Sequence, residues 1–513
     1  MAHAGNLQRT IAAQGGAHFV YLLVVVWAAV GVGEIFMRGT DLLSWIAVAL
    51  IALLFWPLSR FSRSKEKRFL VLAFLVLLQF VYFVVPFLVP RGALEAPFMG
   101  ATFDPAYGAY ILMFAGAFLL LFEIGFMLTS AGRGGELSRR IEERLFSTLA
   151  GTPPIVFIAA MAAMLIAWNF HWEGRIPNSL SFIRHLLSLT VPFGMVALFL
   201  RPRSKVIWTF VFGVVYPCFY LTQIANGFLA SWLIGNAIIV FGYALTRKKV
   251  LWSVGIAAAV ATVPLMPTKS TYRAEYIQTD RWLEMTRMEA GWIFASMTVE
   301  YFNGELNIRH ADVATEQSVS RMTMAPIVFS RVLQLHESGV ADFQEGATLW
   351  DLPLSIVPRA IFPWKPEKTS GQWFGHTYGF LSPTNFRTSV NLPPIIESYV
   401  NFGNAGPLLG LLLGLITGWL SRVLGNAESP ASAFAVALVF SGFGNAETAI
   451  SIIYGQALQT LVFVWLILKL MPSSRSAPLH RTNRVGAQAP AVALVADGKR
   501  PMVSSGGFPG RIS

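Results

Sequence analysis

The chain has 513 residues, of which 55% are hydrophobic and only 13% are charged, and its mean hydropathy is +0.56. Soluble globular proteins carry about 25% charged residues, so this composition excludes that class and predicts an all-α polytopic membrane protein. The formal net charge of +12 does not indicate a nucleic-acid partner, because much of the excess lies in short loops and in the C-terminal tail. The single cysteine, Cys218, excludes an intramolecular disulfide.

Apolar runs of about 20 residues predict about twelve transmembrane helices. They lie near 18–37, 42–58, 69–89, 107–129, 152–170, 183–200, 206–222, 227–245, 250–266, 405–421, 430–446 and 452–470. The first run is too long for the core of a signal peptide and is predicted to be a retained span. The second run is short, and the eleventh is rich in Ala, Gly and Ser, so these two are the weakest members of the set.

Lys and Arg residues gather in every second loop between these runs. The basic loops hold Arg60, Arg63, Lys65, Lys67 and Arg68; Arg133, Arg139, Arg140 and Arg144; Arg201, Arg203 and Lys205; and Arg247, Lys248 and Lys249. The positive-inside rule places such loops in the cytoplasm. Both termini are then predicted to be cytoplasmic, and the long segment 267–404 is predicted to lie on the outer side of the membrane.

Four parts follow along the chain. Residues 1–266 form a nine-span membrane region, 267–404 a large outer loop with the candidate active site, and 405–471 a three-span membrane region. The tail 472–513 is rich in Ser, Pro, Ala, Gly and Arg and has one acid, so it is predicted to be disordered. A weak attraction to anionic lipid is the only role that its composition indicates.

Helical periodicity recurs in two stretches of the outer loop and in the tenth span. Apolar residues spaced by three and four between 279 and 303 predict one or two helices lying on the membrane surface. A second helix is predicted over 318–337, whereas four prolines between 353 and 366 favour extended or re-entrant backbone. In the tenth span, glycines at 406, 410, 414 and 418 predict a smooth stripe that lets another helix approach closely.

Cations with few neighbouring acids mark the proline-rich part of the outer loop. They are Arg359, Lys365, Lys368 and Arg387, and Glu367 is the only acid between Arg359 and Glu397. Arg and Lys together suit the oxygens of a diphosphate. The alternative is that these side chains snorkel beside lipid headgroups. Arg321, in a locally uncharged stretch, is a further candidate anion ligand, or else forms an ion pair with an acid such as Glu316.

Two residues are candidates for a catalytic base, His376 and Glu397. A neutral imidazole can accept a proton near neutral pH, and Glu397 can act as a base or orient an arginine. A lone histidine is more often structural, so both interpretations of His376 stay open. Glu123 lies in the middle of the fourth span, where a carboxylate is a functional candidate, and it keeps a transporter function open.

The sequence contains no Gly-rich phosphate loop, no metal-protease motif and no Cys or His spacing for a metal. No cofactor or metal is therefore predicted, and any reaction must use a substrate that is already activated.

Four stretches together resemble one family: Arg321, the segment 343–349 (Phe-Gln-Glu-Gly-Ala-Thr-Leu), the segment 356–366 (Ile-Val-Pro-Arg-Ala-Ile-Phe-Pro-Trp-Lys-Pro) and the segment 397–406 (Glu-Ser-Tyr-Val-Asn-Phe-Gly-Asn-Ala-Gly). These stretches resemble the Wzy-type polymerases of bacterial O-antigen and exopolysaccharide. Such membrane glycosyltransferases join oligosaccharide repeat units linked to undecaprenyl diphosphate. The resemblance implies a GT-C-like bundle in the inner membrane with its site on the periplasmic face, and no metal or nucleotide sugar.

By the same resemblance, Arg321, Arg359 and Lys365 would hold the diphosphate. The implied partners are the lipid-linked oligosaccharide, a polysaccharide chain-length regulator and other export proteins. The alternatives are an O-antigen ligase, a secondary transporter or flippase for lipid-linked glycan, and a structural subunit of an export complex.

Overall fold

The computed structural model describes residues 42–64, 66–88, 94, 97–132, 134–177, 181–199, 204–227, 229–247, 253, 260–261, 263–306, 311–357, 362, 370–386, 388–445 and 447–470. The chain divides into two units, Met1–Met471 and Pro472–Ser513, and the second lies wholly outside the described residues. The predicted first span, 18–37, and most of the ninth, 250–266, also lie outside them.

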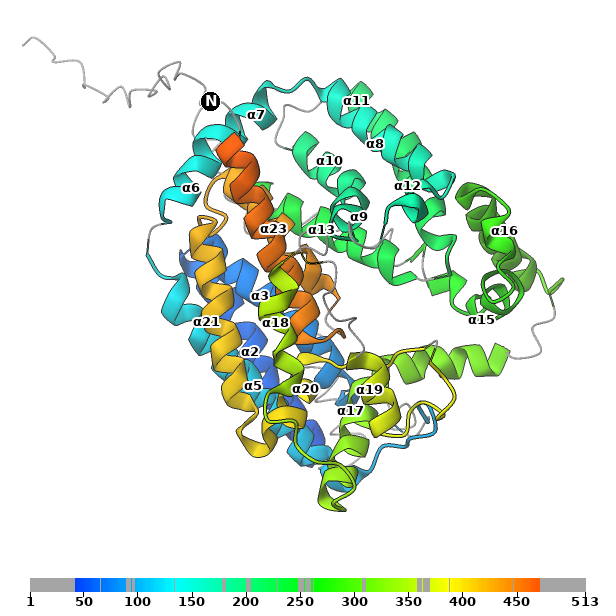
Figure 1. Cartoon of the computed structure of the whole chain (residues 1–513). Helices are drawn as coiled ribbons and strands as arrows, with labels where there is room; N and C mark the ends of the chain where they lie inside the picture. The colour runs from blue at the N-terminus through cyan, green and yellow to red at the C-terminus, as the bar shows by residue number, and fades with distance from the viewer. Residues whose placement is uncertain are drawn as a thin grey trace, which may run out of the picture. The chain divides into compact units, whose positions relative to one another are not determined.

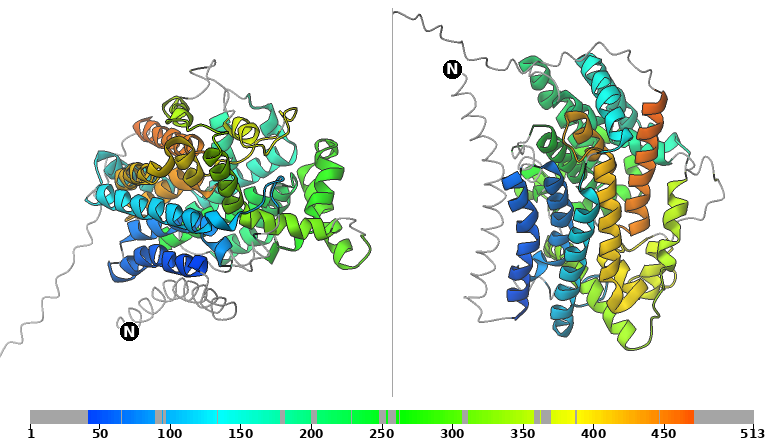
Figure 2. Two further views of the ribbon diagram at one scale, coloured as in Figure 1. Left: turned by 90° about the horizontal axis from the view of Figure 1, so that it is seen from below. Right: turned by 90° about the vertical axis from the view of Figure 1, so that its left-hand side faces the viewer.

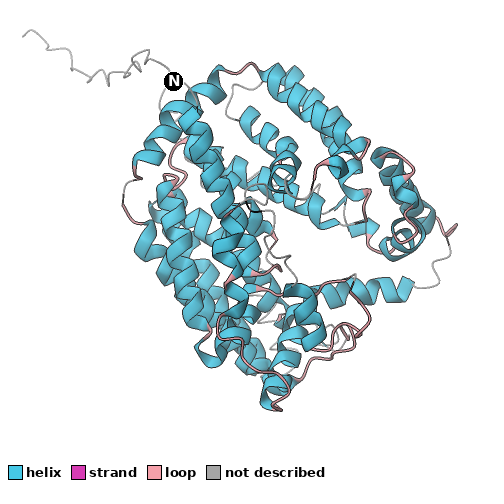
Figure 3. Cartoon of the chain, in the orientation of Figure 1, coloured by secondary structure: helices cyan, strands magenta, loops and turns pink. Residues whose placement is uncertain are grey.

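The described part of the chain is helical (Figure 3), and it contains no strand beyond one isolated bridge between Phe98 and Ala101. The prediction of an all-α protein is therefore confirmed. Helices satisfy their own backbone hydrogen bonds, which apolar surroundings require.

Four helical stretches are long and apolar enough to cross a membrane: Leu42–Ser64 (α2), Pro105–Ser130 with α5 (Gly108–Ser130), Lys205–Ile224 with α11 (Lys205–Phe210) and α12 (Tyr216–Ile224), and Ile450–Leu470 (α23). The bent pair Glu136–Leu149 and Pro154–Asn169, with 88° between its halves, would add a fifth. These helices indicate a membrane protein. The count of twelve spans stays a prediction.

Several other predicted spans coincide with shorter apolar helices. They are α3 (Lys67–Phe83), α10 (Thr190–Phe199), α13 (Leu229–Arg247), α21 (Pro407–Val423) and α22 (Pro430–Val439). The run 430–446 is helical only to Val439 and continues as a 3-10 turn, Phe440–Gly444. Conversely, the short run 42–58 extends to Ser64, with Pro57 tolerated inside α2.

The glycine stripe of α21 packs directly on α5 (Figure 1), and this confirms the predicted close helix contact. A Cβ added at Gly410 would lie 2.5 Å from the carbonyl oxygen of Phe118, and one at Gly414 would overlap the carbonyl oxygen of Phe122. The matching order of these contacts makes α5 and α21 parallel. Because no side chain separates the two backbones, any larger residue in the stripe must push the helices apart.

The helices of the outer-loop segment share the hydrophobic core of this bundle. α17 (Ala311–Glu337) packs against α3 and α5, and α18 (Asp351–Ile356) packs against α23 (Figures 1 and 2). Phe329 of α17 is fully buried, 5.3 Å from the ring of Phe114 on α5. The predicted helix over 318–337 is thus present, and its second half belongs to the core of the first unit.

A further helix, α16 (Arg287–Phe302), occupies the predicted helical stretch 279–303, and it begins with a capping box between Thr286 and Glu289. One face of this helix packs against the rest of the chain, and the other face is exposed. Phe294 and Met297 are buried, whereas Trp292 and Val299, two of the apolar residues with the predicted spacing, are exposed, as a helix that lies on the membrane surface requires. The spacing identified the helix but not the side that contacts α12, because Gly291 lets the α12 backbone approach that side.

Candidate functional site

The two described motif segments, 343–349 and 397–406, lie against each other. The backbone N–H of Gln344 donates to the carbonyl of Val400 at 2.9 Å, and that of Glu345 donates to the carbonyl of Asn401 at 3.0 Å. Two stretches that are about fifty residues apart in the sequence therefore form one structural element, which includes the second half of α20 (Pro394–Phe402).

Two positions of this element must be glycine for steric reasons. Gly403 has φ +55°, a conformation that L-residues rarely adopt, and a Cβ there would lie 2.9 Å from the ring of Phe343. A Cβ at Gly406 would lie 2.7 Å from the carbonyl oxygen of Ser398. Both positions therefore require glycine to join α20 to α21.

Glu397 connects three elements of the fold through hydrogen bonds. It is fully buried; its Oε1 accepts from the Thr348 hydroxyl at 2.7 Å, and its Oε2 accepts from the N–H of Ile450, the first residue of α23, at 2.7 Å. Asn401 donates to Thr348 Oγ1 and to the carbonyl oxygen of Glu397. A carboxylate whose two oxygens both accept hydrogen bonds suits fixing α20 against α23 better than taking a proton.

An aromatic and polar cluster lies at the C-terminal end of α17. We call Arg331, His336, Phe343, Tyr378 and Tyr399 the α17 cluster. His336 stacks on Phe343 with 4.4 Å between ring centroids, and its Nε2 lies 2.9 Å from the Tyr378 hydroxyl. The edge of Tyr399 meets the same imidazole at 5.5 Å. Arg331 and His336 lie on α17, Phe343 in the segment after it, Tyr378 directly after α19 (Ser370–Thr377) and Tyr399 on α20, so the cluster joins parts of the chain that are distant in sequence.

Burial sets the protonation state of the cluster. It lowers the pKa of His336, against the opposing effect of the Asp342 carboxylate, and it raises the pKa of the Tyr378 and Tyr399 hydroxyls. The imidazole is therefore neutral near pH 7. One ring nitrogen of a neutral imidazole accepts protons and the other donates, so His336 can take part in proton transfer.

Arg331 supplies the cluster with a positive charge. Its side chain is half-buried, and among the residues that the structure describes no acid or acceptor pairs with it. Its Nη2 would lie 3.7 Å from a Cβ at Gly379, which places the guanidinium beside the residue that follows Tyr378. A half-buried guanidinium without an acid suits the oxygens of an anionic ligand.

His376, the other predicted base, lies on α19 two residues before Tyr378. Its Nε2 is buried and makes no hydrogen bond within the described part of the chain, and its ring is 5.1 Å from that of Phe386. Close contacts of Gly371 and Gly375 with Ser389, Val390 and Leu381 hold the helix in place. A buried nitrogen without a partner is costly, so it remains a candidate to bind a ligand.

The predicted cations Arg359, Lys365, Lys368 and Arg387 lie outside the described residues, and Arg321 has a described helical backbone in α17 but no described side chain. Both ends of the segment that carries Arg359, Lys365 and Lys368 are anchored. Before it, the carbonyl oxygen of Ser355 at the end of α18 accepts from the Gln459 side chain of α23. After it, α19 begins, with His376 in its last turn.

Sequence reasoning did not select Arg331 and His336, although it placed both on the predicted helix. The spacing of Arg331 and His336 forms no recognisable motif, because the residues around them, Phe343, Tyr378 and Tyr399, come from other segments of the chain. Within the described ranges, no group of three or more His, Cys, Asp or Glu residues is placed to hold a metal ion.

Comparison with family models, curated proteins and solved structures returned no match to this chain.

Proposed function

We propose that this protein is a membrane glycosyltransferase that polymerises undecaprenyl-diphosphate-linked oligosaccharide repeat units into a surface polysaccharide or exopolysaccharide. The reaction takes place at the periplasmic face of a bacterial inner membrane. In this proposal the fold has about twelve spans in a GT-C-like arrangement, both termini are cytoplasmic, and 267–404 is the periplasmic segment. A polysaccharide chain-length regulator and other export proteins are the expected partners.

The proposal is supported by the half-buried Arg331, which has no acid partner among the described residues and lies beside Gly379, the residue after Tyr378, whose hydroxyl contacts the neutral His336. A cation stabilises a departing diphosphate, and a neutral base can accept the proton of the acceptor hydroxyl. The resemblance adds Arg359 and Lys365 as further diphosphate ligands, with Arg321, Lys368 and Arg387 as additional cations of the same site.

The chemistry balances without a cofactor. The hydroxyl oxygen of the acceptor sugar attacks the anomeric carbon of the donor, and the bond from that carbon to the diphosphate oxygen breaks. The diphosphate leaves with the bonding electrons, and cations stabilise its growing negative charge. The hydroxyl proton passes to a base, for which His336 and His376 are the candidates, and Glu397 positions α20.

The proposal is tested by analysing surface polysaccharide in a deletion strain. We expect long polymer to disappear while a product with a single repeat unit remains. Complementation with Arg359→Ala should leave polymer reduced by roughly ten- to a hundredfold, because a charge-assisted contact to an ionised group contributes about 1.5–3 kcal/mol. Arg359→Lys should also fail substantially, since Lys cannot make a two-pronged contact.

Arg287→Ala is the matched control, because Arg287 lies at the start of α16 and packs over the Trp282 ring instead of joining the α17 cluster. Amounts are normalised to membrane protein level. Full-length polymer from Arg359→Ala at the wild-type amount would remove Arg359 from the site and favour the snorkelling interpretation. Loss of capped lipid A with intact free polymer would instead indicate an O-antigen ligase.

One observation favours a second candidate, a secondary transporter or flippase for lipid-linked glycan. Glu123 is buried within α5, and its Oε1 has no hydrogen-bond partner among the described residues. Intramembrane carboxylates often serve ion-coupled transport. A Glu123→Gln variant that keeps polymer synthesis in the complemented strain would exclude this function, whereas accumulation of lipid-linked repeat units on the cytoplasmic side would support it.

A further inference from the structure

A cavity of about 320 Å³ lies at the C-terminal end of α5, where three turns between helices meet. These are the turn from α2 to α3, the segment after α5, and the turn from α21 to α22. We call this space the turn cavity. It is lined by Glu66, Arg68, Gly132, Gly134, Ser138, Gly425, Asn426 and Glu428. α5 has 23 residues, so the cavity lies roughly 35 Å along this helix from the end that contacts α17.

Both signs of charge face the turn cavity. Nε of Arg68 lies 2.6 Å from Oε2 of Glu66, with side-chain exposures of 16% and 42%. This ion pair does not have the geometry of a hydrogen bond, and within the described ranges the buried Nε–H of Arg68 has no hydrogen-bond acceptor. Glu428 is exposed on the opposite turn. The described lining of the cavity therefore offers one cation and two carboxylates to a ligand.

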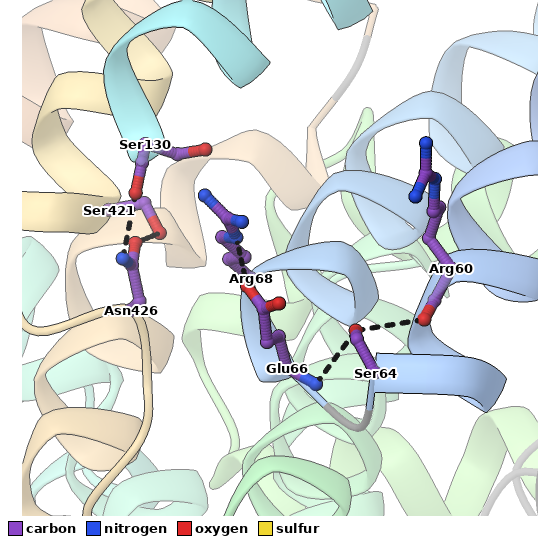
Figure 4. A network of polar contacts seen from close by, with 7 residues as sticks. All are labelled: Arg60, Ser64, Glu66, Arg68, Ser130, Ser421 and Asn426. Carbon is purple, nitrogen blue, oxygen red and sulfur yellow. Dashed lines mark hydrogen bonds and ion pairs between the residues drawn. The ribbon is translucent and has the colours of Figure 1, made fainter. Parts of the chain in front are cut away.

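A second buried polar atom at this end of α5 also lacks a partner. Ser130 is fully buried, and its Oγ makes no hydrogen bond within the described part of the chain. Figure 4 shows the guanidinium of Arg68 on the side that faces Ser130 and Asn426. Buried polar atoms without partners are rare, and a ligand or water at the site is the usual explanation.

The turn that closes the cavity is held in a costly conformation. Gly425, Asn426 and Ala427 all have positive φ, at +83°, +50° and +58°. The Asn426 side chain donates to the carbonyl of Ser130 and accepts from the hydroxyl of Ser421, both at 2.9 Å (Figure 4). Consecutive left-handed residues persist only where surrounding contacts enforce them, so the floor of the cavity is preformed.

Exposed apolar side chains lead along α5 to the cavity. Leu120, Ile124 and Leu128 recur every four residues on one face and are 48%, 43% and 66% exposed. α5 is one of the candidate membrane spans. An apolar stripe that ends beside a charged cavity matches the shape of a phospholipid, with acyl chains on the stripe and a headgroup in the cavity.

We propose that the turn cavity binds the zwitterionic headgroup of a phosphatidylethanolamine-type lipid. The lipid phosphate contacts the Arg68 guanidinium, and its primary ammonium contacts the carboxylates of Glu428 and Glu66. A primary ammonium carries a positive charge and donates three hydrogen bonds. The trimethylammonium of phosphatidylcholine has no N–H to donate, and the glycerol of phosphatidylglycerol has no positive charge. The site is separate from the α17 cluster and does not depend on the proposed reaction.

Native mass spectrometry of the purified full chain tests this assignment. The protein is offered equal amounts of dioleoyl phosphatidylethanolamine, phosphatidylcholine and phosphatidylglycerol, with and without free phosphoethanolamine. We expect preferential retention of phosphatidylethanolamine that free phosphoethanolamine does not displace. Arg68→Gln and Glu428→Gln should each lower that retention about three- to fivefold, the size expected of a charge contact near the surface. Because Glu428 is exposed, its substitution leaves folding intact.

Arg139→Gln and Glu143→Gln are the controls, since this pair is exposed at the same end of the bundle but does not line the cavity. Both should retain the lipid as the wild type does. Equal retention of the three lipids, preference for phosphatidylglycerol, or unchanged retention in both cavity variants would overturn the assignment. Binding of free phosphoethanolamine without any retained phosphatidylethanolamine would overturn the lipid as occupant and leave a site for the soluble headgroup.

Discussion

The surroundings of polar groups differ between the two ends of α5. At its start, the neighbouring α17 cluster is packed with aromatic rings: Tyr399 lies 5.6 Å from Phe114 of α5, and His336 stacks on Phe343 at 4.4 Å. At its end, charged groups face an open cavity. Packed surroundings strengthen electrostatic contacts, whereas an open site screens them. The first end therefore suits chemistry, and the second suits reversible binding.

The largest expected effect comes from breaking the helix pair that connects the two ends. Gly414→Leu places a side chain where the Phe122 carbonyl lies, so α5 and α21 must separate. We expect the free energy of unfolding to fall by more than the loss of about 1–3 kcal/mol that is typical of over-packed cores. Little folded protein should then be obtained. The measurement is the yield and melting temperature of detergent-solubilised protein.

Gly213→Leu is the matched control, because a Cβ at Gly213 meets nothing within 4 Å and the residue is exposed on an apolar helix. Gly414→Ala is a milder variant that should fold with a lower melting temperature. Equal stability of Gly414→Leu and Gly213→Leu would mean that the two helices are not packed as described.

Next in size is the charge of the α17 cluster. Arg331→Gln should slow polymer synthesis by roughly ten- to a hundredfold, since a contact to an ionised group is lost in the transition state. Arg331→Lys should keep part of the synthesis rate, because it retains the positive charge. Arg139→Gln, at the other end of α5, should change the rate little because its side chain is 69% exposed. Gel analysis of polymer amount and length checks all three, and a wild-type rate for Arg331→Gln would remove Arg331 from the site.

A smaller effect concerns pH. Burial holds the pKa of His336 below its usual value, so the folded protein binds this proton less readily than the unfolded chain does. The neutral imidazole therefore contributes fully to stability above about pH 6.5, the pKa of histidine in an unfolded chain. That contribution is lost as the pH falls toward and through the pKa of His336 in the folded protein. His336→Gln should therefore make the melting temperature fall less steeply between pH 7.5 and 5. An identical slope in the two proteins would contradict a neutral buried imidazole.

The smallest expected effect is that of the C-terminal tail. Truncation after Ser476 should leave polymer synthesis intact, because the tail has no apolar pattern that packs. Loss of polymer at a normal protein level would show that the tail contacts a partner.

Sequence periodicity predicted those parts of the fold that depend on one helix at a time. The glycines of 406–418 identified a helix face made for close contact, and composition identified the helical class. Neither could name α5 as the partner of that face. The α17 cluster was missed for the same reason: His336 meets Tyr378 across 42 residues of sequence, and such contacts leave no local period. Glu397 was selected for its charge, but its hydrogen bonds to Thr348 and Ile450 become visible only in the folded chain.

Transfer of a glycan from a lipid diphosphate can be measured directly. The most direct measurement uses the purified full chain in vesicles supplied with lipid-linked repeat units, and follows polymer and free undecaprenyl diphosphate together. We expect one lipid diphosphate to be released for every linkage formed, and the amounts of both products to fall together in Arg331→Gln. Movement of intact lipid-linked repeat units across the membrane, with no released diphosphate, would contradict it and leave a transporter in its place.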